Sequence, residues 1–323
     1  MDVLADLLSR ARASGSLFAE TVLHGRGGVT MPAELAPLAV HVVRRGRLWA
    51  HVDGVQRQLG EGDVLLVRAP TGLDVTAGAS ERPTPLTALL AATGDSLEGP
   101  AADVPAAGAP GVRRLVLPGE GPEAALLCGA YALRGTVCDR LLHALPPLVH
   151  VPAASAPREL RLLLQLLAVE LVGGAPGQQT ALDRLLDLIL VHVLRAHFAA
   201  TGATGGTVPP WYAALADPGV GAAMRALHTE PARAWTVARL AREAGQSRAT
   251  FARRFTALVG EPPMTYLTAW RMTLAQDALH TGGTTLAAIA REVGYSSEYA
   301  LSAAFTRHVG EAPSRWRSRV TGG

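Results

Sequence analysis

The last hundred residues contain the same supersecondary unit twice. Residues 240–263 read LAREAGQSRATFARRFTALVGEPP, and residues 289–313, about fifty positions later, read IAREVGYSSEYALSAAFTRHVGEAP. Two copies are too few for a solenoid, in which at least three stacked repeats are needed to bury a continuous core. The repeat therefore predicts a pair of small helical modules, and it carries the functional signal of the chain.

Each copy has the residues that start and stop two short helices joined by a turn. In the first copy Thr236 can cap a leading helix, Gly245 can end it, and Ser247 can cap a second helix. Such caps give partners to backbone groups that a helix end leaves without them. The equivalent positions of the second copy hold Thr285, Gly294 and Ser297. This pattern is typical of a helix-turn-helix.

The second helix of each copy is expected to present an outward face to DNA. Its inward row holds Phe255 and Leu258 in one copy and Phe305 and His308 in the other. The outward residues of the first copy are Ser247, Arg248, Ala249, Thr250, Ala252, Arg253 and Thr256. Those of the second copy are Ser297, Glu298, Tyr299, Ser302, Ala303, Thr306 and Arg307. An outward Arg in mid-helix can donate two hydrogen bonds to a guanine, although an ordinary solvated helix face is the alternative.

The C-terminal third resembles the AraC family of bacterial transcription regulators. The residues that carry the resemblance are WTVARLAREAGQSRATFARRF at 235–255, YLTAWRMTLAQDAL at 266–279 and IAREVGYSSEYALSAAFTRHVGEAPSRWR at 289–317. The resemblance implies a domain of two helix-turn-helix units joined by a long helix. Members of that family usually have Arg at the position of Ala303, so the second unit is expected to bind mainly through DNA shape and phosphates.

A single helix is expected between the two copies. Pro262-Pro263 can open it and Gly282-Gly283 can close it. Its inner positions at helical spacing are Leu267, Trp270, Arg271, Leu274 and Ala278. Such a helix would fix the separation of the two reading helices, so that they enter successive major grooves. An ordinary core helix is the alternative, and both interpretations can hold together.

The distribution of charge along the chain agrees with DNA binding by the C-terminal part. Residues 207–323 hold 13 Arg and 8 acidic residues, whereas residues 1–206 hold 17 Arg and 19 acidic residues. The basic half is therefore the half with the helical repeat, as DNA binding requires. The chain contains no Lys, so every phosphate contact from a basic side chain must come from Arg.

The N-terminal half is expected to be rich in short strands. Apolar or β-branched runs occupy 40–43, 48–52, 56–59 and 64–67, with Asp53-Gly54 as a hairpin turn and residues 60–63 as the next corner. A leading helix is expected over 3–13, and a long excursion between strands over 80–111. The segment HVVRRGRLWAHVDGVQRQLGEGDVLLV, together with 126–133 and 141–152, resembles the cupin-type sensor domain of one branch of the same family.

A cupin barrel raises the possibility of a metal-dependent enzyme. His41 and His51 lie on neighbouring strand-like segments, but PTGLD at 70–74 stands where related sensors commonly have a further His. No full metal set is therefore expected, and neither a catalytic residue nor a cofactor is predicted. His41, Trp49 and His51 are candidate ligand-binding residues inside the barrel, and packing residues are the alternative.

Two cysteines suggest a possible redox response. Cys128 and Cys138 flank a strand and a turn and lie close in sequence. If both face a pocket, thiol oxidation can switch the regulator. The alternative, which the sequence favours, is a pair of small buried apolar residues, because no basic cluster near either thiol would lower its pKa.

Two amphipathic helices are expected after the strands, at 158–172 and 179–199. Their apolar stripes are Leu160, Leu163, Leu164, Leu167 and Leu171 in one helix and Leu182, Leu185, Leu186, Ile189, Val193 and Leu194 in the other. Such a pair can cover the barrel or join a second subunit. The family resemblance implies dimerisation.

The sequence thus predicts an α+β multidomain chain with four parts. These are a cupin-like β-barrel sensor at 1–156, a helical hairpin at 157–200, a linker at 201–210 and an all-α double helix-turn-helix domain at 211–323. We expect a sequence-specific transcription regulator controlled by a small-molecule or redox signal. Its expected partners are promoter DNA, a second copy of the chain and, for an activator, RNA polymerase. A metal-dependent cupin enzyme with an appended DNA-binding domain is the alternative.

The expected location is the cytoplasm, with no membrane partner. No run of eighteen or more apolar residues occurs, and residues 1–16 carry acidic residues among the apolar ones, unlike a signal peptide.

Overall fold

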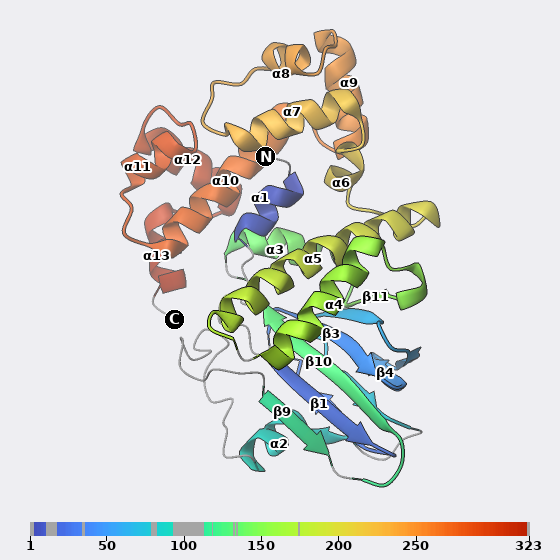
Figure 1. Cartoon of the computed structure of the whole chain (residues 1–323). Helices are drawn as coiled ribbons and strands as arrows, with labels where there is room; N and C mark the ends of the chain where they lie inside the picture. Colours follow the sequence, from blue (N-terminus) through green and yellow to red (C-terminus); the bar gives the residue numbers. More distant parts are fainter. Residues whose placement is uncertain are drawn as a thin grey trace. The chain divides into compact units, whose positions relative to one another are not determined.

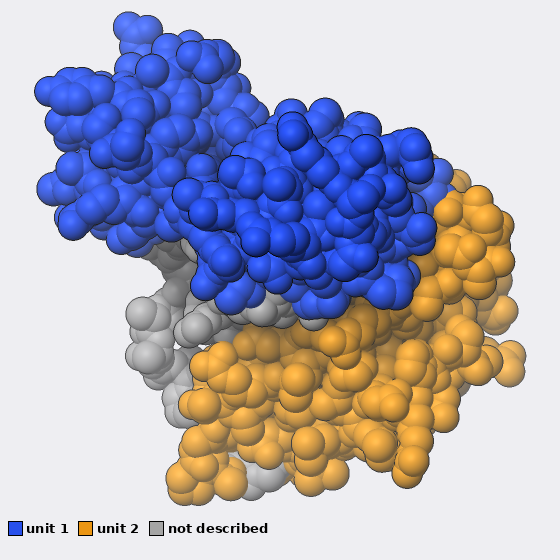
Figure 2. Space-filling view, turned by 90° about the horizontal axis from the view of Figure 1, so that it is seen from above, with its two compact units in different colours: residues 1–10, 134–141, 207–323 blue, residues 11–133, 142–206 orange. Residues whose placement is uncertain are grey.

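The chain divides into two compact units that are not continuous in sequence. The computed structural model describes residues 3–10, 18–33, 36–78, 83–92, 113–117, 119–131, 133, 135–173 and 175–321. One unit comprises residues 1–10, 134–141 and 207–323, and the other comprises residues 11–133 and 142–206 (Figure 2). The expected boundaries place residues 1–10 and 134–141 with the sensor, whereas these segments pack within the C-terminal unit.

The sheet-rich unit is a sandwich of two sheets (Figure 1). Its strands are β1 (Phe18–His24), β2 (Gly28–Met31), β3 (Leu38–Arg45), β4 (Leu48–Val52), β5 (Val55–Leu59), β6 (Val64–Arg68), β7 (Leu73–Thr76), β8 (Thr84–Pro85), β9 (Arg113–Leu117), β10 (Glu123–Tyr131) and β11 (Leu148–Val151). The strand orders are β11-β6-β3-β10-β1-β9 and β5-β4-β7-β2-β8. The expected sheet-rich N-terminal domain is confirmed, although the described strands form two separate sheets and not a closed barrel.

The strands expected from 40–43, 48–52, 56–59 and 64–67 are confirmed as β3 to β6. The hairpin between β4 and β5 turns at Asp53 and Gly54, whose φ angles of 47° and 76° both lie in the left-handed region. A two-residue hairpin turn that matches the strand twist requires such angles. Alternate residues such as Val43, Leu65 and Leu126 then fill the space between the sheets.

Three helices complete this unit: α2 (Leu86–Ala92), α4 (Arg158–Gly173) and α5 (Gln178–Ala203), with a 3-10 turn, η2 (Ala153–Ser155), before α4. All six residues of the stripe expected on α5 are buried. The Tyr131 hydroxyl of β10 donates a hydrogen bond to the Leu186 carbonyl at 2.8 Å, which fixes α5 to the sheet. Among the helices described, α5 is long and apolar enough to cross a membrane. Its row of buried residues, however, is typical of a core helix.

The helical unit contains both copies of the repeat. Its elements are α1 (Val3–Arg10), α3 (Thr136–His143, up to residue 141), α6 (Pro210–Ala214), α7 (Pro218–Thr229), α8 (Val237–Glu243), α9 (Arg248–Val259), α10 (Pro263–Thr281), α11 (Leu286–Glu292), α12 (Glu298–Val309) and α13 (Pro313–Thr321). The linker is shorter than expected because α5 continues to Ala203 and α6 begins at Pro210. Phe251, Phe255 and Phe305 are fully buried, whereas His308 is exposed and therefore does not belong to the core row.

Residues from the N-terminal half complete the core of the helical unit. Asp6 of α1 lies 2.8 Å from His228 Nδ1, and His228 Nε2 lies 2.8 Å from the Tyr266 hydroxyl. The backbone N–H of Val137 donates to the Asp277 carboxylate at 3.2 Å. These contacts join α1 to α7 and α3 to α10. They also give partners to the buried carboxylates, which would be costly to bury alone.

Candidate nucleic-acid interface

The expected helix caps are present in both copies of the repeat. Thr236 and Ser247 accept hydrogen bonds from the backbone N–H groups of Arg239 and Thr250, each at 3.2 Å. In the second copy Thr285 and Ser297 accept from Ala288 and Ala300, also at 3.2 Å. The caps set the start of each helix and therefore the rotation of its outward face. We call α8–α9 the first module and α11–α12 the second module.

The outward face of α9 carries two uncommitted arginines. Arg248 and Arg253 are exposed, and neither forms a hydrogen bond or ion pair with the part of the chain that the structure describes. Arg254 differs because its guanidinium binds the carboxylate of Asp217, the residue that caps α7. Arg254 is thus held by the fold, whereas Arg253 keeps all its donors for a ligand.

The other expected positions of α9 have smaller roles. The Ser247 hydroxyl donates to the Thr250 hydroxyl at 2.9 Å, and the Thr256 hydroxyl donates to the Ala252 carbonyl at 2.9 Å. Ala249 is exposed, so the face offers room for a base edge or a thymine methyl group beside Arg253.

Arg253 lines an open surface hollow of about 640 Å³. Its walls are mostly apolar and come from α8, α9 and the start of α10: Val237, Ala252, Thr256, Ala257, Pro262, Pro263 and Met264. The guanidinium therefore lies beside a weakly polar surface, where its donors meet little competition from protein acceptors.

The outward face of α12 has a different chemistry. Tyr299 is 79% exposed, and Ala303 stands exposed at the position that Arg253 occupies in the first module. Glu298 places a carboxylate in the first turn, and Arg307 is exposed in the last turn. Ser302 is half-buried and Thr306 exposed. Near its middle this face presents the methyl group of Ala303 where α9 presents the cation of Arg253, and in its first turn it presents the ring of Tyr299 where α9 has Ala249.

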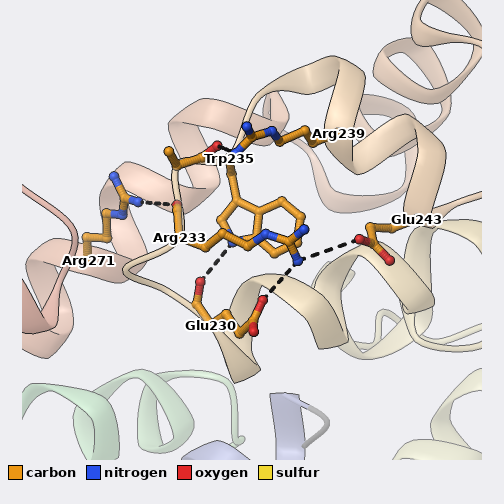
Figure 3. A network of polar contacts seen from close by, with 7 residues as sticks. Glu230, Arg233, Trp235, Arg239, Glu243 and Arg271 are labelled. Carbon is orange, nitrogen blue, oxygen red and sulfur yellow. Dashed lines mark hydrogen bonds and ion pairs between the residues drawn. The ribbon is translucent and has the colours of Figure 1, made fainter.

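The helix α10 joins the two modules, as the sequence indicates. It is buried along much of its length, including Tyr266, Leu267 and Trp270. Arg271 extends from it to the loop before the first module. There its Nη2 donates to the Arg233 carbonyl at 2.9 Å (Figure 3), and its Nε donates to the Pro231 carbonyl at 2.8 Å. The same guanidinium lies 5.8 Å from the ring of Tyr295 in the turn of the second module. Arg271 therefore connects both modules.

The loop that Arg271 holds is itself a compact polar network (Figure 3). Arg233 lies 4.4 Å from the Trp235 ring and pairs with Glu230 at 2.9 Å and Glu243 at 3.8 Å. Trp235 Nε1 donates to the Glu230 carbonyl at 2.8 Å, and Arg239 Nη1 donates to the Ala234 carbonyl at 2.6 Å. These arginines stabilise the loop, and their donors are engaged there, unlike those of Arg248 and Arg253.

The two turn glycines are matched in conformation but differ in surroundings. Gly245 and Gly294 have φ angles of 64° and 83°, which favour glycine. A Cβ added to Gly245 meets no atom within 4 Å. A Cβ added to Gly294 would lie 2.6 Å from the Ala232 carbonyl oxygen and 2.7 Å from Arg271 Nη2. The turn of the second module is therefore pressed against the loop that Arg271 holds.

Two further arginines belong with this surface. Arg242 and Arg291 occupy equivalent places in the last turns of α8 and α11, and both are exposed. Neither was singled out from the sequence, although ARE occurs at the same place in both copies. The first helix of a helix-turn-helix generally crosses the DNA backbone, and these two side chains lie exposed at its end in each module.

The structure separates the three expected ligand-binding residues of the sensor. His41 of β3 is 2% exposed and faces the space between the sheets, and burial lowers its pKa to about 4. Trp49 and His51 alternate along β4 with the buried Leu48, Ala50 and Val52, so they lie on the outer face of the other sheet. The sandwich interior therefore contains His41 without Trp49 or His51.

The two cysteines belong to different units. Cys128 lies in β10, is partly exposed and sits beside His41, whereas Cys138 lies buried in α3. Neither forms a disulfide. Burial raises the pKa of the Cys128 thiol to about 12, so it carries almost no thiolate at neutral pH.

The paired modules define a class of DNA-binding protein in which one chain presents two recognition helices. The chain matches the family model described as Cupin over residues 2–199 and the one described as Helix-turn-helix domain over residues 240–319. It is 36% identical to an AraC-like transcription regulator of Streptomyces lividans, over 99% of both chains. A second such regulator, from Streptomyces antibioticus, is 36% identical over 98% of both chains.

The DNA-binding domain of AdpA, a global transcriptional factor solved in complex with a target DNA, also resembles this chain. The two are 33% identical over 32% of this chain and 93% of that one, with a TM-score of 0.30. From the family model and the full-length relatives, the chain belongs to the AraC-like transcription regulators, with an N-terminal cupin domain and a C-terminal helix-turn-helix DNA-binding domain.

Proposed function

We propose that the chain is a signal-responsive promoter-binding regulator in which α9 is the principal base reader. The observation that carries this proposal is the exposed Arg253, which is free of protein partners in the described chain and lies in the middle of a capped recognition helix. A bidentate contact from Arg to guanine O6 and N7 is the commonest specific contact in the major groove.

In this proposal the second module mainly positions the protein on the duplex and contributes little to base recognition. Tyr299 and Ala303 provide apolar contact, while Arg307 and Arg291 contact phosphates, as Arg242 does in the first module. Phosphate contacts fix register and orientation without reading sequence directly. The test compares Arg253→Ala with Arg291→Ala on one selected duplex and on variants at each base. Arg291→Ala should weaken all duplexes by a similar factor, whereas Arg253→Ala should lose its preference at one position. Uniform loss in both variants would contradict the assignment.

We further propose that the regulator acts as a homodimer through α4. Leu162, Leu166 and Val169 lie at spacings of four and three residues along α4, and they are 52%, 53% and 68% exposed. An exposed apolar row of this kind is typical of a helix that packs against a partner. Sedimentation of the full chain should give a dimer, and Leu166→Glu with Val169→Glu should give a monomer. A monomeric wild type at micromolar concentration would refute this assembly.

The cupin unit is the proposed sensor. Its ligand would favour one arrangement of the DNA-binding halves and so shift the population that can bind a promoter. Activation through RNA polymerase and a cytoplasmic location complete the proposal. Transcription in vitro from a selected promoter, with purified polymerase and the full chain, tests the activating role, and reduced transcription would indicate a repressor.

The enzyme alternative receives no support from the relatives, which are named as regulators. Within the described residues, no cluster of three or more His, Cys, Asp or Glu side chains could hold a catalytic metal ion.

A further inference from the structure

Three side chains of the sandwich interior bring soft donor atoms together. His41 and Cys128 are register partners on β3 and β10, and the distance from His41 Nδ1 to Cys128 Sγ is 3.2 Å. Met31, at the end of β2 in the opposite sheet, places its Sδ 3.9 Å from the same Sγ. A thiol, a thioether and an imidazole therefore meet between the sheets.

We propose that Cys128, His41 and Met31 bind one Cu(I) ion. Thiolate and thioether sulfur are soft ligands that select Cu(I), and imidazole also suits copper. With metal–donor bonds of about 2.0–2.3 Å, as found for thiolate and imidazole on zinc, donors of a trigonal site lie roughly 3.5–4 Å apart. The separations from Cys128 Sγ to His41 Nδ1, 3.2 Å, and to Met31 Sδ, 3.9 Å, lie close to or within that range.

The charge of the surroundings favours a monovalent ion. The core around these residues is aliphatic and includes Val43, Leu73 and Leu126. One thiolate neutralises Cu(I), whereas a divalent ion with the same ligands would leave a net positive charge in an apolar interior, at a high cost. The described residues also lack the His and carboxylate cluster that such an ion would require.

Metal binding displaces one proton. A ring nitrogen of a neutral imidazole has a lone pair to donate to the ion. At Cys128 the S–H bond breaks, a Cu–S bond forms and the proton goes to solvent, with no change of oxidation state. Cys128 is only partly buried as a residue, whereas His41 and Met31 are buried.

Copper in this place would tie the two sheets of the sandwich, because Met31 belongs to one sheet and the other two ligands belong to the other. This identifies the chemical class of signal for the sensor, and in that respect it rests on the function proposed above. The binding site and the signalling role are separable by experiment.

The binding test uses the full chain, reduced and free of oxygen, titrated with Cu(I) in competition with a chromogenic Cu(I) chelator. We expect one Cu(I) per chain, and X-ray absorption should show a first shell of two sulfur atoms and one nitrogen. Cys128→Ser should weaken binding at least a hundredfold. Met31→Leu conserves core volume, so the fold should persist, and binding should weaken at least tenfold. Cys138→Ser, the matched control in the helical unit, should bind like the wild type.

The outcomes distinguish the site from the function. A folded wild type that retains no Cu(I) against the chelator, or a Cys128→Ser chain that binds normally, would overturn the site. If the copper site is overturned in this way but DNA affinity, measured in parallel, stays normal, the proposed regulator function stands without the copper site. If one Cu(I) binds per chain and shifts promoter affinity in the wild type but not in Met31→Leu, the result supports both the copper site and its signalling role.

Discussion

The first and second modules share a fold and differ in what they offer to DNA. Both use a threonine cap, a glycine turn and a serine cap, with the same capping distances. On the outward face, however, the first module has Arg253 and the second has Ala303 and a largely exposed Tyr299. The cap and turn residues that build the module are thus the same in both copies, while the outward-facing residues of the second helix differ. The turn of the second module also packs more closely against its surroundings, because Gly294 lies against the backbone of Ala232 whereas Gly245 has open space.

The largest expected effect separates the two turns. Gly294→Ala combines left-handed strain with a clash against backbone at Ala232, so it should lower the free energy of unfolding by about 2–4 kcal/mol. The matched change Gly245→Ala has strain without a clash and should cost about 1–2 kcal/mol. Urea unfolding followed by tryptophan fluorescence measures both. Equal costs would show that the contact with the loop at 230–235 is not tight.

Removal of the proposed base reader should affect binding rather than stability. Arg253→Ala should weaken binding to the selected site by about 1–3 kcal/mol, because a bidentate base contact is lost. Fluorescence anisotropy with a labelled duplex measures the affinity. Arg254→Ala is the control, since it removes the ion pair with Asp217 and should change thermal stability more than base preference. An unaltered affinity in Arg253→Ala would place the reading face elsewhere.

Outside the two modules, the helical unit also depends on α1, which packs against α6 and α7. Asp6→Ala would leave the buried His228 without one partner and should destabilise the helical unit by about 1–3 kcal/mol. Burial lowers the pKa of His228 in spite of Asp6, so the unfolded chain takes up more protons near pH 6.5 than the folded chain does. Stability should therefore fall as pH drops from 7.5 to 5.5. His228→Gln should reduce this slope, and an unchanged slope would exclude His228 as its source.

The relative placement of the modules should depend on Arg271. Arg271→Lys loses the fork that donates to two carbonyl groups, and about 1 kcal/mol of DNA affinity should be lost with it. The sharper expectation is a relaxed preference for half-site spacing. Duplexes with one base pair added or removed between half-sites measure this. Arg319→Lys, a change at an exposed pair with Glu311, is the control and should retain the spacing preference.

Local features were predictable from the sequence because their physics is local. Caps, turn glycines, the hairpin at Asp53-Gly54 and the helix α10 depend on residues a few positions apart. The error at His308 has the same origin. Counting three residues from Phe305 marks position 308, whereas the row in the structure runs through Leu301, Phe305 and the partly buried Val309.

Features that depend on distant residues were not predictable. The contact from Asp6 to His228 joins residues 222 positions apart, and nothing near residue 6 indicates it. Alternation along strands is the same in a closed barrel and in a two-sheet sandwich, so the choice between them depends on pairing. Met31 likewise reaches Cys128 only because two sheets pack face to face.

Selection of bound sequences from a random DNA pool tests the inequality of the two modules most directly. The full-length wild type should select one half-site with a strongly preferred guanine and a second half-site with weak preferences. Arg253→Ala should lose that guanine, and Ala303→Arg should gain a new preference in the second half-site. Two half-sites of equal information in the wild type, or identical selections by all three proteins, would contradict the account.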